Sequence, residues 1–129
     1  MRKLAVILFL FLFFFQFGCV KQELERQTIF NSYHVLFNSQ FNYDLIMTRA
    51  GEKYELGLFS EEDKETLMEV ATVFYQKYRT ASAALLSFKR KQELSIVTDM
   101  DNRYLERVFN DFEEAYLNLM ITAQTLEVM

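Results

Sequence analysis

The segment that decides the fold spans residues 60–92 and reads SEEDKETLMEVATVFYQKYRTASAALLSFKRKQ. Its apolar residues recur at steps of three and four, the spacing of one helical face; they are Leu67, Val70, Phe74, Tyr78, Ala81, Leu85 and Phe88. Ser60 followed by three acids is typical of a helix N-cap, and the cations of residues 89–91 suit the C-terminal end of a helix dipole. The segment therefore predicts one long amphipathic helix.

Similar patterns flank this segment. Residues 22–49 predict a preceding helix, and residues 99–127 predict a following one whose inward side carries Asp101, Tyr104, Leu105, Val108, Phe112, Ala115, Leu119, Thr122 and Leu126. A break near residues 93–98 is expected because Thr98 begins a second N-cap pattern; one continuous helix is the alternative. The chain has no proline and only three glycines, which leaves little to punctuate strands. The fold class is therefore all-α, an antiparallel three-helix bundle.

The predicted helix over residues 22–49 has one strongly aromatic face. The residues at helical spacing are Phe30, Tyr33, Phe37, Phe41, Leu45 and Thr48, widened by Ile29, Leu36, Tyr43, Ile46 and Met47. We expect this face to enter the core. His34, the only histidine, lies on the same side and is expected to be a core-edge residue bonded to a neighbouring helix, rather than a metal ligand or proton carrier.

The N-terminus has the three parts of a secretory signal peptide. Arg2 and Lys3 are followed by an apolar run from Leu4 that is too short for a permanent span, and then by Gly18-Cys19. The stretch Gln16-Phe17-Gly18-Cys19 resembles the lipobox of bacterial lipoproteins, in which a peptidase cuts before a lipid-bearing cysteine. The resemblance implies a signal peptide over 1–18, a lipidated tether over 19–23, a bundle domain over 24–129 and an extracytoplasmic, lipid-anchored location at the cell membrane or outer membrane.

Two other interpretations of this segment remain open. It could be an uncleaved N-terminal anchor, or an ordinary signal peptide that leaves a free thiol. The cysteine count favours lipidation, because a single cysteine cannot form an internal disulfide.

The net charge of the chain bears on which class of partner it binds. The chain has 14 basic and 18 acidic residues. Loss of Arg2 and Lys3 with the signal peptide leaves 12 − 18 = −6. An acidic domain argues against nucleic acid as a partner.

The sequence offers few groups for catalysis or cofactor binding. One histidine and one cysteine do not make a zinc site, and no glutamate stands three residues before His34 to form a di-metal motif. Serines have no second histidine as a partner, and no glycine-rich phosphate loop is present. We therefore expect no catalytic residues, no metal and no cofactor, and a protein that is not an enzyme.

The remaining function classes are protein contact and ligand transport. The expected loop over residues 50–60 combines glycines with Tyr54, Leu56, Leu58 and Phe59, and loops on rigid scaffolds often carry recognition. These four residues are the candidate contact with an envelope protein, although they could instead cap the open end of the core. The alternative function is a carrier of lipid or another apolar ligand, held in a tyrosine-lined cavity between the helices.

A short helical pattern adds a weaker indication. Small residues over 81–84 predict close packing between helices. The pattern Tyr78-x-x-Ala81-x-x-Ala84-Leu85 faintly resembles small helical lipoproteins carried by prophages, which implies an accessory role.

Overall fold

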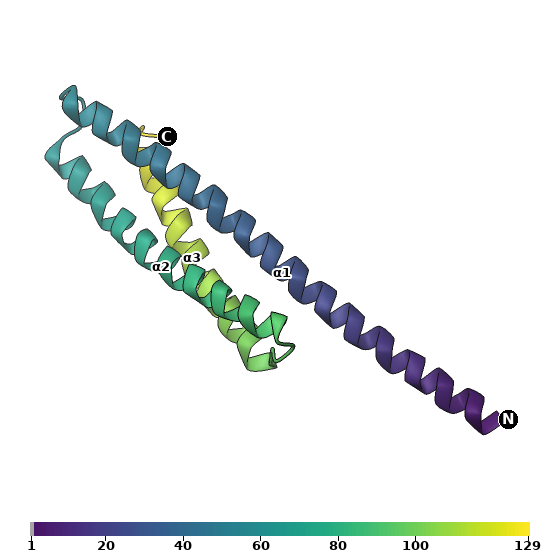
Figure 1. The fold of residues 1–129 in the computed structure, drawn as a ribbon. Coiled ribbons are helices and arrows are strands. Elements are labelled where there is room, and N and C mark those ends of the chain that lie inside the picture. Colours follow the sequence, from purple (N-terminus) through teal and green to yellow (C-terminus); the bar gives the residue numbers. More distant parts are fainter. Residues whose placement is uncertain (1) are drawn as a thin grey trace.

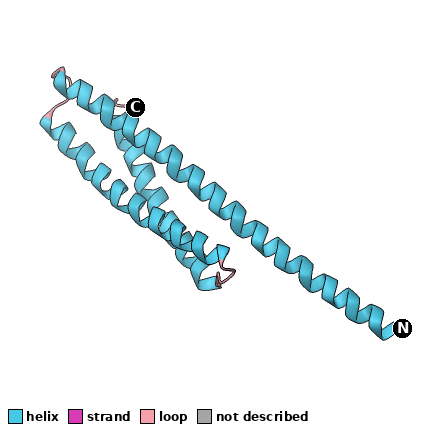
Figure 2. Ribbon diagram, viewed as in Figure 1, coloured by secondary structure: helices cyan, strands magenta, loops and turns pink. Residues whose placement is uncertain are grey.

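The chain forms three helices, with no strand among residues 2–129 (Figures 1 and 2). A computed structural model describes the backbone of residues 2–129 and the side chains of residues 20–129. Helix α1 spans Arg2–Glu55, α2 spans Glu61–Glu93 and α3 spans Asp99–Thr125. Both α2 and α3 lie along the C-terminal half of α1, which extends alone beyond them toward the N-terminus. The expected all-α antiparallel three-helix bundle is confirmed.

Helix α1 is longer than expected at both ends. It runs through residues 19–23, the expected tether, as unbroken helix. The side chains of the expected signal peptide and of Cys19 lie outside the described residues. At the other end the expected loop over 50–60 is wrong, because helix continues to Glu55. Gly51 is an ordinary helical residue at a cost of about 1 kcal/mol relative to alanine, and Gly57 makes the turn.

All three helices end in the same turn, the Schellman motif. In α1 the Leu58 N–H donates to the Lys53 carbonyl at 2.9 Å and the Gly57 N–H donates to the Tyr54 carbonyl at 3.0 Å. The second residue after the end of each helix adopts a positive φ: 70° at Gly57, 55° at Ser95 and 54° at Glu127. Only the first of these positions has glycine, which accepts that conformation without strain.

Ser95, which is not glycine, holds the positive-φ position in the turn after α2, and this predicts the effect of a substitution on stability. Ser95→Gly should raise the free energy of unfolding by about 0.5–1 kcal/mol, because relief of the left-handed strain exceeds the added freedom of the unfolded chain. Urea denaturation of the detergent-solubilised full chain measures it. Gly57→Ala is the matched reverse substitution and should destabilise. A loss of stability in Ser95→Gly would contradict the turn geometry.

The starts of α2 and α3 carry the N-caps that the sequence predicts. The Asp63 N–H donates to the Ser60 hydroxyl at 3.0 Å, and the Ser60 N–H donates to the Asp63 carboxylate at 3.2 Å. Thr98 and Asp101 repeat this reciprocal pair. The Lys91 Nζ donates to Asp101 at 2.5 Å, and this bond with those from Thr98 lowers the pKa of Asp101 to about 2. The break between α2 and α3 is thus confirmed, and one continuous helix is excluded.

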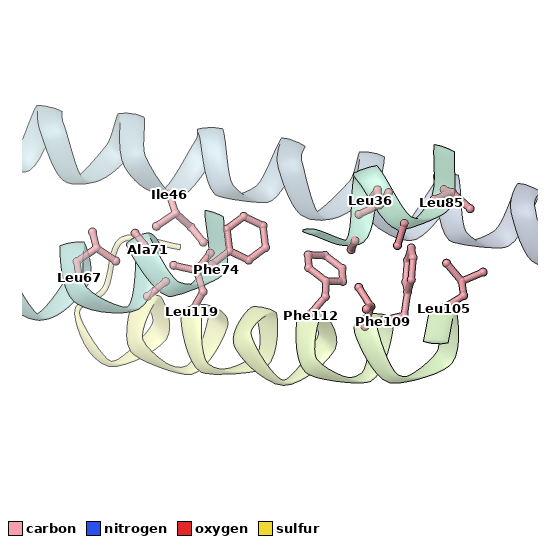
Figure 3. Packing of buried hydrophobic residues seen from close by; sticks show 14 of the residues in the cluster. Leu36, Ile46, Leu67, Ala71, Phe74, Leu85, Leu105, Phe109, Phe112 and Leu119 are labelled. Atoms are coloured by element: carbon pink, nitrogen blue, oxygen red, sulfur yellow. The ribbon is translucent and has the colours of Figure 1, made fainter. Parts of the chain in front are cut away.

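Aromatic rings fill the centre of the bundle. Phe74 is 1% exposed and Phe112 is 0% exposed, and their ring centroids are 5.7 Å apart. Tyr43 from α1 and Tyr116 from α3 lie within 6 Å of Phe74, centroid to centroid. Aliphatic residues from all three helices continue this core on either side, as Figure 3 shows. The expected inward face of α2 is confirmed: its members are buried apart from Val70 and Tyr78, which are partly buried.

Two parts of the expected core are wrong. The inward side of α3 is confirmed for its buried members from Leu105 to Leu119, but Tyr104 is half exposed. On α1 the expected core positions of Ile29, Leu36 and Ile46 are confirmed, and Ser39 and Ala50 are buried with them, but the aromatic residues lie on the opposite face and point away from the bundle. These smaller side chains let α1 lie close to α2, while the phenylalanine face has no helix to pack against. The expected core position of His34 is also wrong, since it is exposed beside Phe30.

Candidate functional site

The predicted contact residues, here called the hairpin end, differ in how far their side chains are exposed. They are Tyr54, Leu56, Leu58 and Phe59. Leu56 is 72% exposed and Leu58 is 70% exposed, at the turn between α1 and α2. Phe59 is only 6% exposed and belongs to the core cluster. The structure therefore places Phe59 as a cap on the core and leaves two leucines in solvent.

Tyr54 is held in place by the first turns of α2. Its hydroxyl donates to the Glu61 carboxylate, and this bond, with Lys64 nearby, lowers the pKa of Glu61. The Lys64 Nζ lies 4.5 Å from the centre of the Tyr54 ring, a cation–π geometry. The tyrosine is thus ordered yet still 41% exposed, so its ring can contact a partner without further immobilisation.

A small apolar crevice opens beside Tyr54. It measures about 160 Å³ and lies between the end of α1 and the start of α2, with Met47, Phe59, Leu67 and Met68 among its walls. Gly51 forms part of its rim, and a Cβ there would meet nothing within 4 Å. The crevice is large enough for one apolar side chain of a partner and too small for a lipid chain.

A second surface lies on α1, on the side away from the bundle. It consists of Phe30, Tyr33, Phe37, Phe41 and Leu45, and is called the outer aromatic face. The three phenylalanines are 62%, 70% and 63% exposed. The His34 ring meets the Phe30 ring edge to face, with centroids 4.5 Å apart. The sequence pattern places these aromatic residues and the aliphatic Ile29, Leu36 and Ile46 on one inward face, but only the aliphatic residues are buried.

The small residues of α2 act as packing residues, as expected. Ala81 and Ala84 are buried, and Ala83 is exposed in an open groove between α2 and α3 of about 630 Å³. Arg79 and Tyr104 also line that groove, so its character is mixed. Another open groove of about 380 Å³ lies between α1 and α3, with Val35, Phe109 and Glu113 among its walls. Neither groove gathers the several tyrosines that a carrier cavity needs.

Residues 20–129, whose side chains the structure describes, carry no candidate metal site or membrane-spanning helix. There, no three histidine, cysteine, aspartate or glutamate side chains converge on a common point. No helix in that part is long and apolar enough to cross a bilayer. Comparison with protein-family models, with curated proteins and with solved structures finds no match to this chain.

Proposed function

We propose that this protein is a lipid-anchored, extracytoplasmic helical protein of the cell envelope that acts through protein–protein contact and not through catalysis. The observation that carries the contact role is the combination of a filled aromatic core with large apolar side chains held in solvent. Rigid, exposed aromatic and leucine residues are typical of protein interfaces. The anchor on Cys19 is supported by the lipobox-like N-terminus and by the single cysteine.

The packing favours this role over that of a lipid carrier. A carrier needs an enclosed apolar cavity, whereas the rings of the inward tyrosines pack against other aromatic rings in the core. Tyr78 and Tyr116 lie within 6.3 Å of Phe112, centroid to centroid. Their hydroxyls bond to Gln40 and Asn42 of α1 at 2.7 and 2.5 Å. These tyrosines join the helices together and occupy the centre of the bundle with their rings.

The hairpin end is the surface we assign to an envelope partner. It lies at the opposite end of α1 from the N-terminus (Figure 1), about 54 Å along the helix from Cys19 at 1.5 Å per residue. The C-terminus lies beside it, where the Lys53 Nζ donates to the Glu127 carbonyl at 2.6 Å. Two exposed leucines, an ordered tyrosine and an apolar crevice therefore share one well-supported end of the molecule.

The experiment replaces both leucines with serine. We expect Leu56→Ser/Leu58→Ser to retain the melting temperature of the original chain, because both side chains are exposed, and to lose the partner that co-purifies with the tagged full chain from cross-linked membranes. Phe59→Ser should instead lower the melting temperature, because Phe59 is buried.

The other turn supplies a matched control. Leu94 and Ile96 hold the same two positions of the Schellman motif after α2, and both are exposed. Leu94→Ser/Ile96→Ser should therefore keep the partner. Equal partner loss in both double variants, or a fall in melting temperature in Leu56→Ser/Leu58→Ser, would refute recognition by the hairpin end.

A further inference from the structure

The outer aromatic face is an exposed apolar patch of the size that is often functional. Three phenylalanines exposed by more than 60%, with Tyr33 and Leu45 beside them, present roughly 500 Å² of apolar surface on a single helix, taking about 200 Å² for each large side chain. The largest apolar patch on a typical monomer is about 300–600 Å² and is often functional. This surface needs an occupant.

Arg26 and Asp44, of opposite sign, lie near the two ends of this face, and the exposed Glu23 lies one turn before Arg26. Arg26 lies before Phe30, and Asp44 lies beside Leu45 at the other end. They are 44 − 26 = 18 residues apart, about five turns of helix, so both lie on the same line along α1. Within residues 20–129, neither of them forms an ion pair with another side chain.

We propose that the outer aromatic face binds the same face of a second copy of this chain, with the two α1 helices antiparallel. A two-fold axis at the height of residue 35 places Arg26 opposite Asp44 of the second copy, since both lie nine residues from that height. Tyr33 and Phe37 exchange places in the same way, and Phe30 meets Phe41 of the second copy within one residue of the same register. The same two-fold axis therefore pairs the opposite charges of the two copies and also their aromatic rings.

The opposite orientation pairs these residues less well. In a parallel, in-register pair Arg26 would face Arg26 and Asp44 would face Asp44, which is repulsive. The antiparallel pair has two attractive contacts instead; such rim charges select orientation more than they add affinity. Two copies of the face bury about 1,000 Å², the lower size of a specific interface.

The spacing of the face also suits a pair of straight helices. Phe30, Tyr33, Phe37, Phe41 and Leu45 follow steps of three, four, four and four residues, close to the repeat of an unstrained α-helix. The two-fold axis is perpendicular to both helices, so the two Cys19 ends lie at equal heights along it. Both anchors reach one bilayer when α1 lies along the membrane surface.

The test places a photo-reactive residue in the full chain within bacterial membranes. With p-benzoylphenylalanine at Leu45, illumination should produce a species of twice the chain mass. In the antiparallel register Leu45 lies at the height of residue 25 of the second copy, where Glu23 and Arg26 are the exposed residues on the side of Phe30. Mass spectrometry should therefore find tryptic peptide 27–49 joined to peptide 22–26. The same probe at Leu86, an exposed residue of α2, is the control and should give no such product.

Charge exchange tests the orientation a second time. Arg26→Asp should lower the yield of cross-linked dimer roughly fivefold, and Arg26→Asp/Asp44→Arg should restore it. Arg103→Asp, an exposed charge on α3, should change nothing. Peptide 27–49 joined to itself, the absence of rescue or the absence of dimer would overturn the inference.

The inference rests on the proposed contact role but concerns a different surface. A cross-link from Leu45 to another protein would therefore overturn the inference while the contact role stands. Loss of the partner in the hairpin-end variants is measured independently of the dimer.

Discussion

Phe74→Ala and Phe112→Ala should each lower the free energy of unfolding by about 3–5 kcal/mol. Both rings are fully buried, and each contacts aromatic residues from a neighbouring helix. Removing one ring costs its burial and leaves a cavity that long, mutually packed helices cannot close. Urea denaturation followed by circular dichroism measures the loss on the detergent-solubilised full chain.

The same substitution on the outer aromatic face is the matched control. Phe37→Ala should change the free energy of unfolding of the dissociated chain by less than about 0.5 kcal/mol, because that ring is 70% exposed. The measurement is made at a protein concentration low enough to exclude pairing. A large loss in Phe37→Ala with small losses at Phe74 and Phe112 would mean that the aromatic face of α1 is buried after all.

Cys19→Ser should abolish lipid labelling and leave the precursor uncut. The lipobox resemblance implies that the thiol of Cys19 carries the lipid and that the peptidase cuts before this residue, so serine removes the group that is modified. Metabolic labelling with palmitate and mass spectrometry of the N-terminus measure both effects. In the original chain we expect a modified peptide that begins at Cys19.

A cysteine moved along the helix supplies the control. Cys19→Ser/Thr28→Cys restores a thiol on an exposed residue of α1 and should remain unlabelled, because the position and not the thiol alone directs lipidation. Labelling of that variant, or a mature N-terminus elsewhere in the original chain, would contradict lipidation at Cys19.

The candidate site was partly predictable. The sequence placed the apolar residues of the hairpin end beside a turn, and Leu56 and Leu58 lie there in solvent. It could not separate them from Phe59, which differs from its neighbours only in the direction of its side chain. The loop was also predicted to be too long, because Gly51 and Gly57 look alike in sequence and only Gly57 adopts a positive φ.

The sequence by itself determined the number of helices, their caps and the inward face of α2. These features depend on local forces: reciprocal bonds within four residues at Ser60 and Thr98, and an apolar pattern with a single clear face. Tertiary structure alone decided which side of α1 is buried. That helix has an aliphatic face and an aromatic face, so its periodicity is satisfied by either rotation. The close approach of α2 to α1 selects the face with the smaller side chains, and the aromatic rings are left to solvent.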